Sequence, residues 1–118
     1  MQNATDMGEY TMDILEEIMA RHPSIGCVRG KGLMIGVEFV KDRTTKEPDI
    51  RLRDQIVDNA FLRGLLLLGC GASTIRIAPP LSVTKHEIDE AMEIFEESIH
   101  MGEVSIDPPS VEVQSVAA

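Results

Sequence analysis

Three segments of the chain carry apolar residues at helical spacing on one face only, and short β-rich runs lie between them. The segments cover about residues 2–21, residues 50–63 and the stretch that begins at Thr84. A helix with one apolar stripe must bury that stripe against another element. The order helix, two strands, helix, two strands, helix therefore predicts an α/β domain whose helices pack on one side of a small sheet.

Local residue chemistry predicts where the three helices begin and end. Pro23 stops the first helix, because the residue before a proline is displaced from the helical region. Gly64 stops the second helix, and Thr84 with Glu87 forms a capping box that starts the third. The second helix is expected to bury an apolar stripe that consists of Ile56, Val57, Ala60 and Phe61.

The first pair of strands is predicted at residues 25–29 and 33–40, with residues 30–32 (Gly-Lys-Gly) between them. The run at 33–40 is almost unbroken in its apolar character, which is typical of a strand buried on both faces. Gly36 within this run indicates a bulge or a close packing partner. The polar residues 41–48 that follow are expected to form a turn or loop.

A second pair of strands is predicted after the second helix. The four leucines at residues 65–68 indicate a short buried strand, and residues 69–71 (Gly-Cys-Gly) are expected to turn the chain. Residues 74–77 form a further strand, which Pro79 and Pro80 close because proline cannot donate to the ladder.

The charge balance narrows the possible partners. The 118 residues include 20 acidic and 11 basic side chains, which give a formal net charge of −9. Scattered basic residues in an acidic chain argue against nucleic acid, since phosphate binding needs clustered Lys and Arg. No apolar stretch approaches a membrane span, and no secretory signal is seen. We expect a single domain located in the cytoplasm, with Cys27 and Cys70 reduced.

The residues by themselves do not predict a catalytic, cofactor or metal site. The three histidines fall at helix ends or on polar faces and are expected to be solvated: His22, His86 and His100. The acidic side chains of the last helix are expected to form a solvated face: Glu90, Glu93, Glu96 and Glu97. The glycine clusters at 30–32 and 69–71 lack the spacing of a phosphate-binding loop and are interpreted as turns.

Arg76 is the side chain that most strongly suggests binding. It lies in the middle of a predicted strand, where alternation places it on the face opposite Ile75 and Ile77. A guanidinium there must stay in water or find an anion, because burying it unpaired is costly. Two interpretations remain open: an edge-strand arginine that reaches solvent, or a bidentate clamp on a substrate carboxylate.

Four ordered blocks resemble the C-terminal part of class-III, pyridoxal-phosphate-dependent aminotransferases. Residues 28–40 (VRGKGLMIGVEFV) resemble the family's "VRGKGLMIGVELV" segment. Residues 63–71 (RGLLLLGCG) are similar to "RGLLLLPCG", with Gly69 in place of the proline. Residues 75–81 (IRIAPPL) resemble "IRLLPPL", and the last helix matches the ending "EEIDEAL-I-EE". The resemblance extends over roughly residues 2–101, and Cys70 with Gly71 favours the 4-aminobutyrate type.

The resemblance implies that residues 1–101 are the C-terminal small domain of a fold-type I transaminase and that residues 102–118 are a flexible tail. In this family the arginine that matches Arg76 binds the substrate carboxylate when an amino group passes from an omega-amino acid to 2-oxoglutarate. Pyridoxal phosphate is bound in the parent enzyme by a lysine of the large domain. None of the four lysines matches that lysine's context: Lys31, Lys41, Lys46 and Lys85.

The resemblance also implies partners for the chain. These are the large domain of the same enzyme, a second copy in a homo-oligomer, and small amino-acid and keto-acid substrates. The fragment by itself is expected to be inactive, because it lacks the lysine that forms the Schiff base. The alternatives are a free-standing small domain that works as a binding or interaction module without catalysis, and an unrelated ligand-binding α/β domain.

Overall fold

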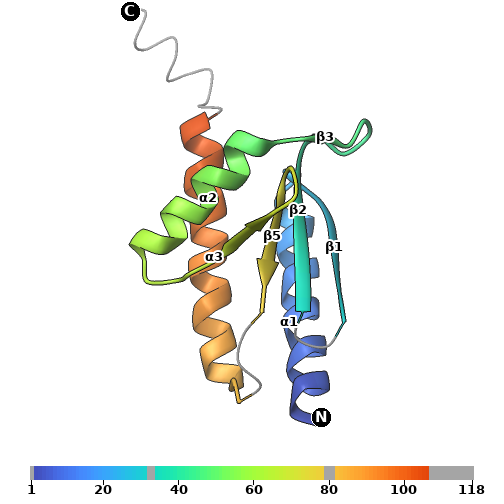
Figure 1. The fold of residues 1–118 in the computed structure, drawn as a ribbon, viewed down its shortest axis with the longest axis vertical. Helices are drawn as coiled ribbons and strands as arrows, with labels where there is room; N and C mark the ends of the chain where they lie inside the picture. Colours follow the sequence, from blue (N-terminus) through green and yellow to red (C-terminus); the bar gives the residue numbers. More distant parts are fainter. Residues whose placement is uncertain (1, 32–33, 79–81, 107–118) are drawn as a thin grey trace, which may run out of the picture.

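The computed structural model describes residues 2–31, 34–78 and 82–106, which form one layer of helices and one sheet (Figure 1). The helices are α1 (Gln2–Arg21), α2 (Ile50–Leu62) and α3 (Lys85–Ile106). The strands are β1 (Ile25–Lys31), β2 (Met34–Asp42), β3 (Glu47–Pro48), β4 (Leu68–Cys70) and β5 (Thr74–Ile77). The predicted element order is therefore confirmed, with β3 as an additional short strand.

The strands pair in the order β1-β2-β5-β4, and every pair is antiparallel. The short β3 pairs with β2 outside this path. The β5 strand therefore lies inside the sheet, between β2 and β4. This order brings β2 and β5, which are separated in the sequence by β3, α2 and β4, into direct contact.

All three helices pack against one face of the sheet. On β2 the residues that face them are Ile35, Val37 and Phe39, which are fully buried together with Ile75 of β5. The ring of Phe39 meets the ring of Phe95 on α3 edge to face, with the centroids 6.4 Å apart. In Figure 1 the strands lie in front of α1 and α3, and no described helix covers the face toward the viewer. The predicted α/β class, with helices on one side of a small sheet, is confirmed.

The predicted burial of β2 on both faces of the sheet is wrong. The run at residues 34–40 is not buried on both faces, because alternate positions of β2 are only half-buried. Gly36 is one of these positions, and it pairs regularly with Arg29 on one side and Arg76 on the other. A bulge at Gly36 is therefore wrong; the register shifts lie at Ile25/Cys27 and at Val40/Asp42 instead.

The ends of α2 are set largely as predicted, and so is its apolar stripe except at Phe61. The side chain of Asp49 accepts a hydrogen bond from the Leu52 amide at 3.1 Å and caps the helix. At the other end Gly64 takes a φ of +89°, a value that only glycine adopts easily. Ile56 is buried, whereas Phe61 is exposed because it lies on the flank that turns away from α3 and the sheet.

The leucines after α2 do not form the predicted buried strand. The amide of Leu65 bonds back to Ala60 at 2.8 Å and closes the helix end. Only Leu67 then enters the core, while Leu66 and Leu68 point outward and are exposed. The β4 strand starts at Leu68 and includes Gly69 and Cys70, so the predicted turn at 69–71 falls two residues later. Within residues 41–48 the predicted turn is present at 43–46, and it joins β2 to the short strand β3 in a hairpin.

The capping box at the start of α3 is confirmed. The amide of Thr84 donates to Glu87 Oε1 at 2.9 Å, and the amide of Glu87 donates to Thr84 Oγ1 at 3.2 Å. The helix continues beyond the predicted boundary at residue 102 and ends at Ile106. Gly102 is buried there, with room for a Cβ limited by Leu52 Cδ1 at 3.1 Å. Helical packing therefore extends the ordered chain, and residues 107–118 of the predicted tail lie outside the described residues.

Candidate anion site on the open face of the sheet

Arg76 lies in the centre of the sheet face that the helices leave open. Its neighbours Ile75 and Ile77 are buried in the core, and its own side chain is exposed on the opposite face, as the alternation predicted. Because β5 pairs with both β2 and β4, the edge-strand interpretation of Arg76 is wrong. The guanidinium therefore projects from an internal strand, where the backbone is held by hydrogen bonds on both sides.

The residues around Arg76 form a hollow rather than a ridge. The cross-strand row through Arg76 contains Arg29 on β1, Gly36 on β2 and Leu68 on β4. A shallow pocket of about 480 Å³ opens over this row. It is lined by Arg29, Gly30, Met34, Ile35, Gly36, Cys70, Thr74 and Arg76.

The guanidinium of Arg76 is available to an anion. Its Nη2 lies 3.6 Å from the Sγ of Cys70, which is a weak acceptor. Among the side chains that the structure describes, no carboxylate lies within ion-pair distance of Arg76. An exposed arginine with only a thiol beside it can still offer its planar fork to a carboxylate.

Arg29 occupies the same face but has more contacts. Its Nη1 lies 3.5 Å from the Sγ of Cys27 and 3.5 Å from Glu38 Oε2. These neighbours, Cys27 first and Glu38 second, raise the pKa of Arg29 above its already high ordinary value. The sequence did not mark Arg29 as a site residue, because its relation to Arg76 depends on two strand pairings.

Three of the four lysines have side chains that the structure describes, and each has contacts of its own. Lys41 pairs with Glu47, the Nζ of Lys46 donates to the Gly26 carbonyl, and Lys85 lies over the Tyr10 ring. None of these three lysines lines the hollow around Arg76. The side chain of Lys31 lies outside the described residues.

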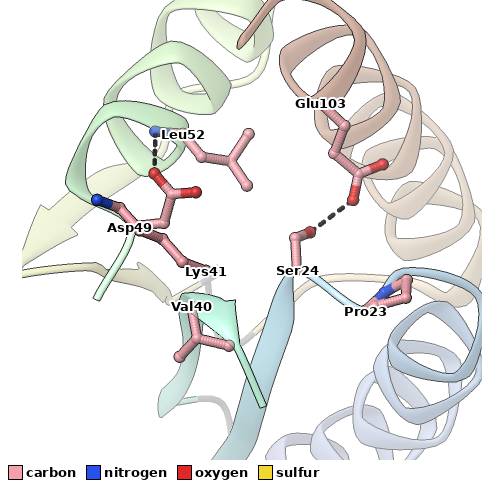
Figure 2. Close-up of a pocket in the computed structure, with 7 residues that line it drawn as sticks. All are labelled: Pro23, Ser24, Val40, Lys41, Asp49, Leu52 and Glu103. Carbon is pink, nitrogen blue, oxygen red and sulfur yellow. Dashed lines mark hydrogen bonds between the residues drawn. The ribbon is translucent and has the colours of Figure 1, made fainter. Parts of the chain in front are cut away.

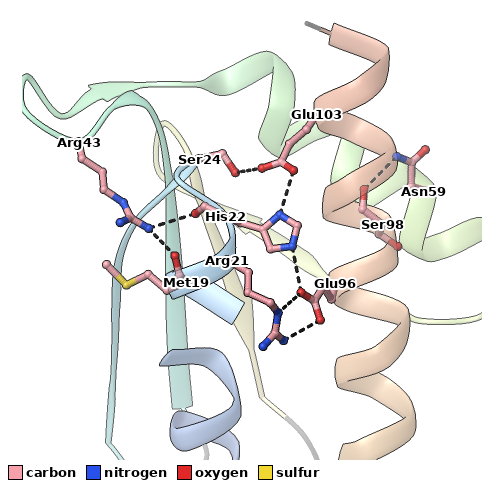
Figure 3. A network of polar contacts seen from close by, with 9 residues as sticks. All are labelled: Met19, Arg21, His22, Ser24, Arg43, Asn59, Glu96, Ser98 and Glu103. Atoms are coloured by element: carbon pink, nitrogen blue, oxygen red, sulfur yellow. Dashed lines mark hydrogen bonds and ion pairs between the residues drawn. The ribbon is translucent and has the colours of Figure 1, made fainter. Parts of the chain in front are cut away.

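His22 contradicts its prediction as a solvated histidine. Its ring is nearly buried and bridges two carboxylates of α3: Nε2 lies 3.0 Å from Glu96 and Nδ1 lies 2.9 Å from Glu103 (Figure 3). Glu96 also accepts two hydrogen bonds from Arg21, at 2.7 and 2.9 Å. His86 and His100 are exposed, as predicted.

Glu96 is correspondingly not part of a solvated face. The guanidinium of Arg21, followed by the ring of His22, holds the pKa of the Glu96 carboxyl below its usual range. Glu96 and Glu103 are seven residues apart, so they share one face of α3 at a spacing that could have indicated a common partner. These contacts tie the end of α1 to α3 and are structural, because they lie away from the hollow around Arg76.

A second pocket lies beside this network, between β2 and the helices α2 and α3 (Figure 2). Its polar groups already have partners: Asp49 caps α2, and Glu103 accepts from Ser24 Oγ at 2.6 Å. Lys41 at its rim pairs with Glu47. The pocket therefore offers no unpaired group that would position a ligand. Elsewhere in the described chain, no helix is long and apolar enough to cross a membrane, and no group of side chains could hold a metal ion.

Comparison with known proteins places this fold in one family. Residues 1–99 match the family described as aminotransferase class-III. An alanine/serine racemase of Pyrococcus horikoshii is 46% identical over 101 residues, which are 84% of this chain and 21% of that protein. A 4-aminobutyrate aminotransferase of Escherichia coli is 39% identical over 97 residues, which are 80% of this chain and 23% of that protein.

Solved structures agree with the sequence comparison. An aminotransferase of Bacillus anthracis has a TM-score of 0.81 at 29% identity, over 84% of this chain and 24% of that one. An omega transaminase of Pseudomonas jessenii has a TM-score of 0.83 at 26% identity, over 91% of this chain and 24% of that one. The chain thus spans about a fifth to a quarter of the relatives it matches. Because the family match covers most of the sequence, the chain belongs to the class-III aminotransferase family.

Proposed function

We propose that this chain is the C-terminal small domain of a 4-aminobutyrate-type transaminase and contributes recognition of the substrate carboxylate. The observation that carries the proposal is Arg76, exposed on an internal strand above a hollow and without a carboxylate partner among the described side chains. The similarity to a 4-aminobutyrate aminotransferase supports this choice. In the parent enzyme the reaction moves an amino group from an omega-amino acid to 2-oxoglutarate.

Arg76 would act by binding and orienting the substrate. Its planar guanidinium can donate two parallel hydrogen bonds to one carboxylate, and lysine cannot reproduce that fork. Because the strand is paired on both sides, the backbone from which this side chain projects is held in place. Fixing the carboxylate in this way orients the rest of the substrate toward the reacting centre.

The remaining parts of the proposal concern the parent enzyme. Pyridoxal phosphate supplies the amino-group chemistry when bound, and its lysine belongs to the large domain. We propose that this large domain and a second copy of the enzyme are the partners of the chain, in the cytoplasm. The small domain in this proposal extends to the end of α3 at Ile106. The isolated chain is expected not to turn over 4-aminobutyrate with 2-oxoglutarate, even with added cofactor.

A second candidate function is racemisation or epimerisation of an α-amino acid. It is favoured by the 46% identity to an alanine/serine racemase and the 35% identity to an isoleucine 2-epimerase of Lentilactobacillus buchneri. Arg76 would serve the same purpose there, since those substrates also carry a carboxylate. The two functions differ in whether a dicarboxylate must bind.

The test is half-reaction kinetics on the parent enzyme with Arg76→Lys. We expect the affinity for glutamate and 2-oxoglutarate to fall by about tenfold or more, equivalent to about 1.4 kcal/mol per decade. Cofactor absorbance should stay unchanged, since Arg76 does not contact the cofactor in this proposal. Conversion of L-alanine to D-alanine, without use of 2-oxoglutarate, would favour the racemase. Loss of cofactor with unchanged keto-acid affinity would show that Arg76 is structural.

A further inference from the structure

Arg53 is a nearly buried arginine of α2 that reaches the turn between β4 and β5. Only 12% of its side chain is exposed. Its Nη1 donates to the carbonyl of Thr74 at 3.0 Å and to the carbonyl of Cys70 at 3.4 Å. These two residues face each other in the last pair of the hairpin before the turn. The guanidinium therefore fastens α2 to both strands of the hairpin at once, while its Nε donates to Asp54 at 2.8 Å.

Gly69 makes room for this guanidinium. It pairs with Ile75, whose side chain is buried on the helix side of the sheet. A Cβ built on Gly69 would lie 2.8 Å from Arg53 Nη1 and 3.1 Å from Arg53 Cζ, so the guanidinium would have to move. The φ of Gly69 lies outside the left-handed region, so the backbone does not require glycine there. Gly69 is also the position at which residues 63–71 depart from the segment that they resemble.

The hairpin that Arg53 holds also carries residues of the hollow. Cys70 and Thr74 line the hollow together with Arg76, which follows Thr74 by two positions in β5. Their side chains lie on the open face of the sheet, and Arg53 holds their carbonyls from the helix side. The β4 strand has three residues and forms an edge of the described sheet. A bond from α2 therefore supplies a restraint that strand pairing does not give on that side.

We propose that Arg53 is a positioning residue, which fixes the hairpin that presents Arg76, and that Gly69 is the residue that admits it. This inference rests on the proposed function for Arg76 and adds the device that orients the site before a ligand arrives. Arg53 does not touch the substrate and acts through the backbone of β4 and β5. A site that is ordered in advance does not lose binding energy to ordering when the ligand binds.

A positioning role predicts an effect on affinity and not on the step that follows binding. Without the contacts of Arg53, only a fraction of the molecules hold Arg76 in the orientation that binds. The apparent Kd rises by the reciprocal of that fraction, and the bound state is unchanged. A fraction between one half and one fifth raises the apparent Kd roughly two- to fivefold.

The first test measures backbone order in the folded 118-residue chain by NMR relaxation. Arg53→Met keeps an unbranched side chain and removes the guanidinium. The amide order parameters of residues 70–76 should fall from about 0.85 toward about 0.6, whereas those of β1 should not change. Arg51→Met is the matched control, because Arg51 is an exposed arginine of the same helix. Unchanged order at the hairpin, or an equal loss in β1, would overturn the inference.

Gly69→Ala is the second variant, and it keeps the charge of Arg53. The guanidinium can move into the adjoining pocket of about 430 Å³, so the chain should still fold, but the bonds to the two carbonyls are lost. Gly69→Ala should therefore reproduce the loss of order seen in Arg53→Met. In the Arg53→Met background it should add nothing, because the two changes remove the same contact. Additive effects would show that Gly69 and Arg53 act separately and would contradict the proposal.

The second test is half-reaction kinetics on the parent enzyme with 2-oxoglutarate. Arg53→Met and Gly69→Ala should each raise the apparent Kd roughly two- to fivefold and leave the limiting rate and the cofactor absorbance unchanged. Arg53→Lys keeps a donor and should recover part of the affinity, and Arg51→Met should change nothing. A fall in the limiting rate together with loss of cofactor would show general damage and overturn the positioning role.

The comparison with Arg76→Lys distinguishes this inference from the proposed function. If Arg76→Lys weakens 2-oxoglutarate and Arg53→Met does not, the positioning role is overturned and the role of Arg76 stands. If Arg76→Lys leaves the affinity unchanged, the proposed function is overturned and the positioning role with it. Any loss of order at the hairpin would then be a structural effect of Arg53 alone.

Discussion

Replacing Glu96 by alanine should destabilise the domain more than replacing Glu93, an exposed acidic residue of the same helix. Glu96 accepts from Nε2 of His22 at 3.0 Å, and only 10% of the His22 side chain is exposed. Removing the carboxylate leaves a nearly buried donor without its acceptor, which costs about 1–3 kcal/mol. Because 29% of the Glu96 side chain is itself exposed, water can replace part of the contact, and we expect about 1–2 kcal/mol.

The assay is urea and thermal unfolding of Glu96→Ala beside Glu93→Ala. Glu93 is exposed on the same helix, so both variants exchange the same side chain for alanine and share any change in helix propensity. The melting temperature of Glu96→Ala should fall by about 4 °C for each kcal/mol lost, a value between those of smaller and larger domains. An equal effect of the two substitutions would refute the reasoning, because it would show that the contact with His22 adds nothing.

The same substitution should change the dependence of stability on pH. The contacts with Arg21 and then His22 hold the pKa of Glu96 in the folded state below its ordinary value of 4.5. A lowered pKa stabilises the fold fully above the unfolded value, and this stabilisation is lost as the pH falls through the folded value. The original chain and Glu96→Ala should therefore differ most above about pH 4.5 and converge below it. A difference that persists unchanged into acid would exclude this electrostatic contribution.

Three further substitutions test the ends of the helices by urea unfolding. Gly64→Ala should cost about 1 kcal/mol, because a φ of +89° strains an L-residue, whereas Gly36→Ala should cost nothing. Thr84→Ala should cost about 1 kcal/mol by removing the cap of α3, and Thr84→Ser should retain most of the stability; equal losses would argue against the cap. Gly102→Leu should cost about 1–3 kcal/mol because a Cβ there already lies 3.1 Å from Leu52, and an unchanged midpoint would mean that α3 ends earlier.

Much of this domain could be predicted because the signals are local. The capping box at Thr84 and the stop at Gly64 depend on a few neighbouring residues, and both were confirmed. The side of the strand on which Arg76 lies follows from alternation with Ile75 and Ile77. The order of helices and strands follows from hydrophobic period alone. Each of these features depends only on residues within about one helical turn, or within neighbouring positions of one strand.

The errors occurred where a residue's environment depends on distant parts of the chain. Phe61 has helical spacing with the core residues of α2, but the packing angle of that helix leaves it exposed. The leucines at 65–68 suit a strand, yet the helix cap and the short partner β5 leave only Leu68 to begin one. His22 is polar and follows a helix, but α3 places Glu96 and Glu103 at its two nitrogens.

The candidate site illustrates the same division. Arg76 could be singled out from the sequence, because an arginine between two buried isoleucines must face away from the core. Its partners could not be, since Arg29 and Gly36 reach it only through the strand order β1-β2-β5-β4. That order is decided by how three helices cover one face of the sheet, which is a property of long-range packing. The sequence therefore determined that the Arg76 side chain points away from the core, and the tertiary structure decided which residues surround it.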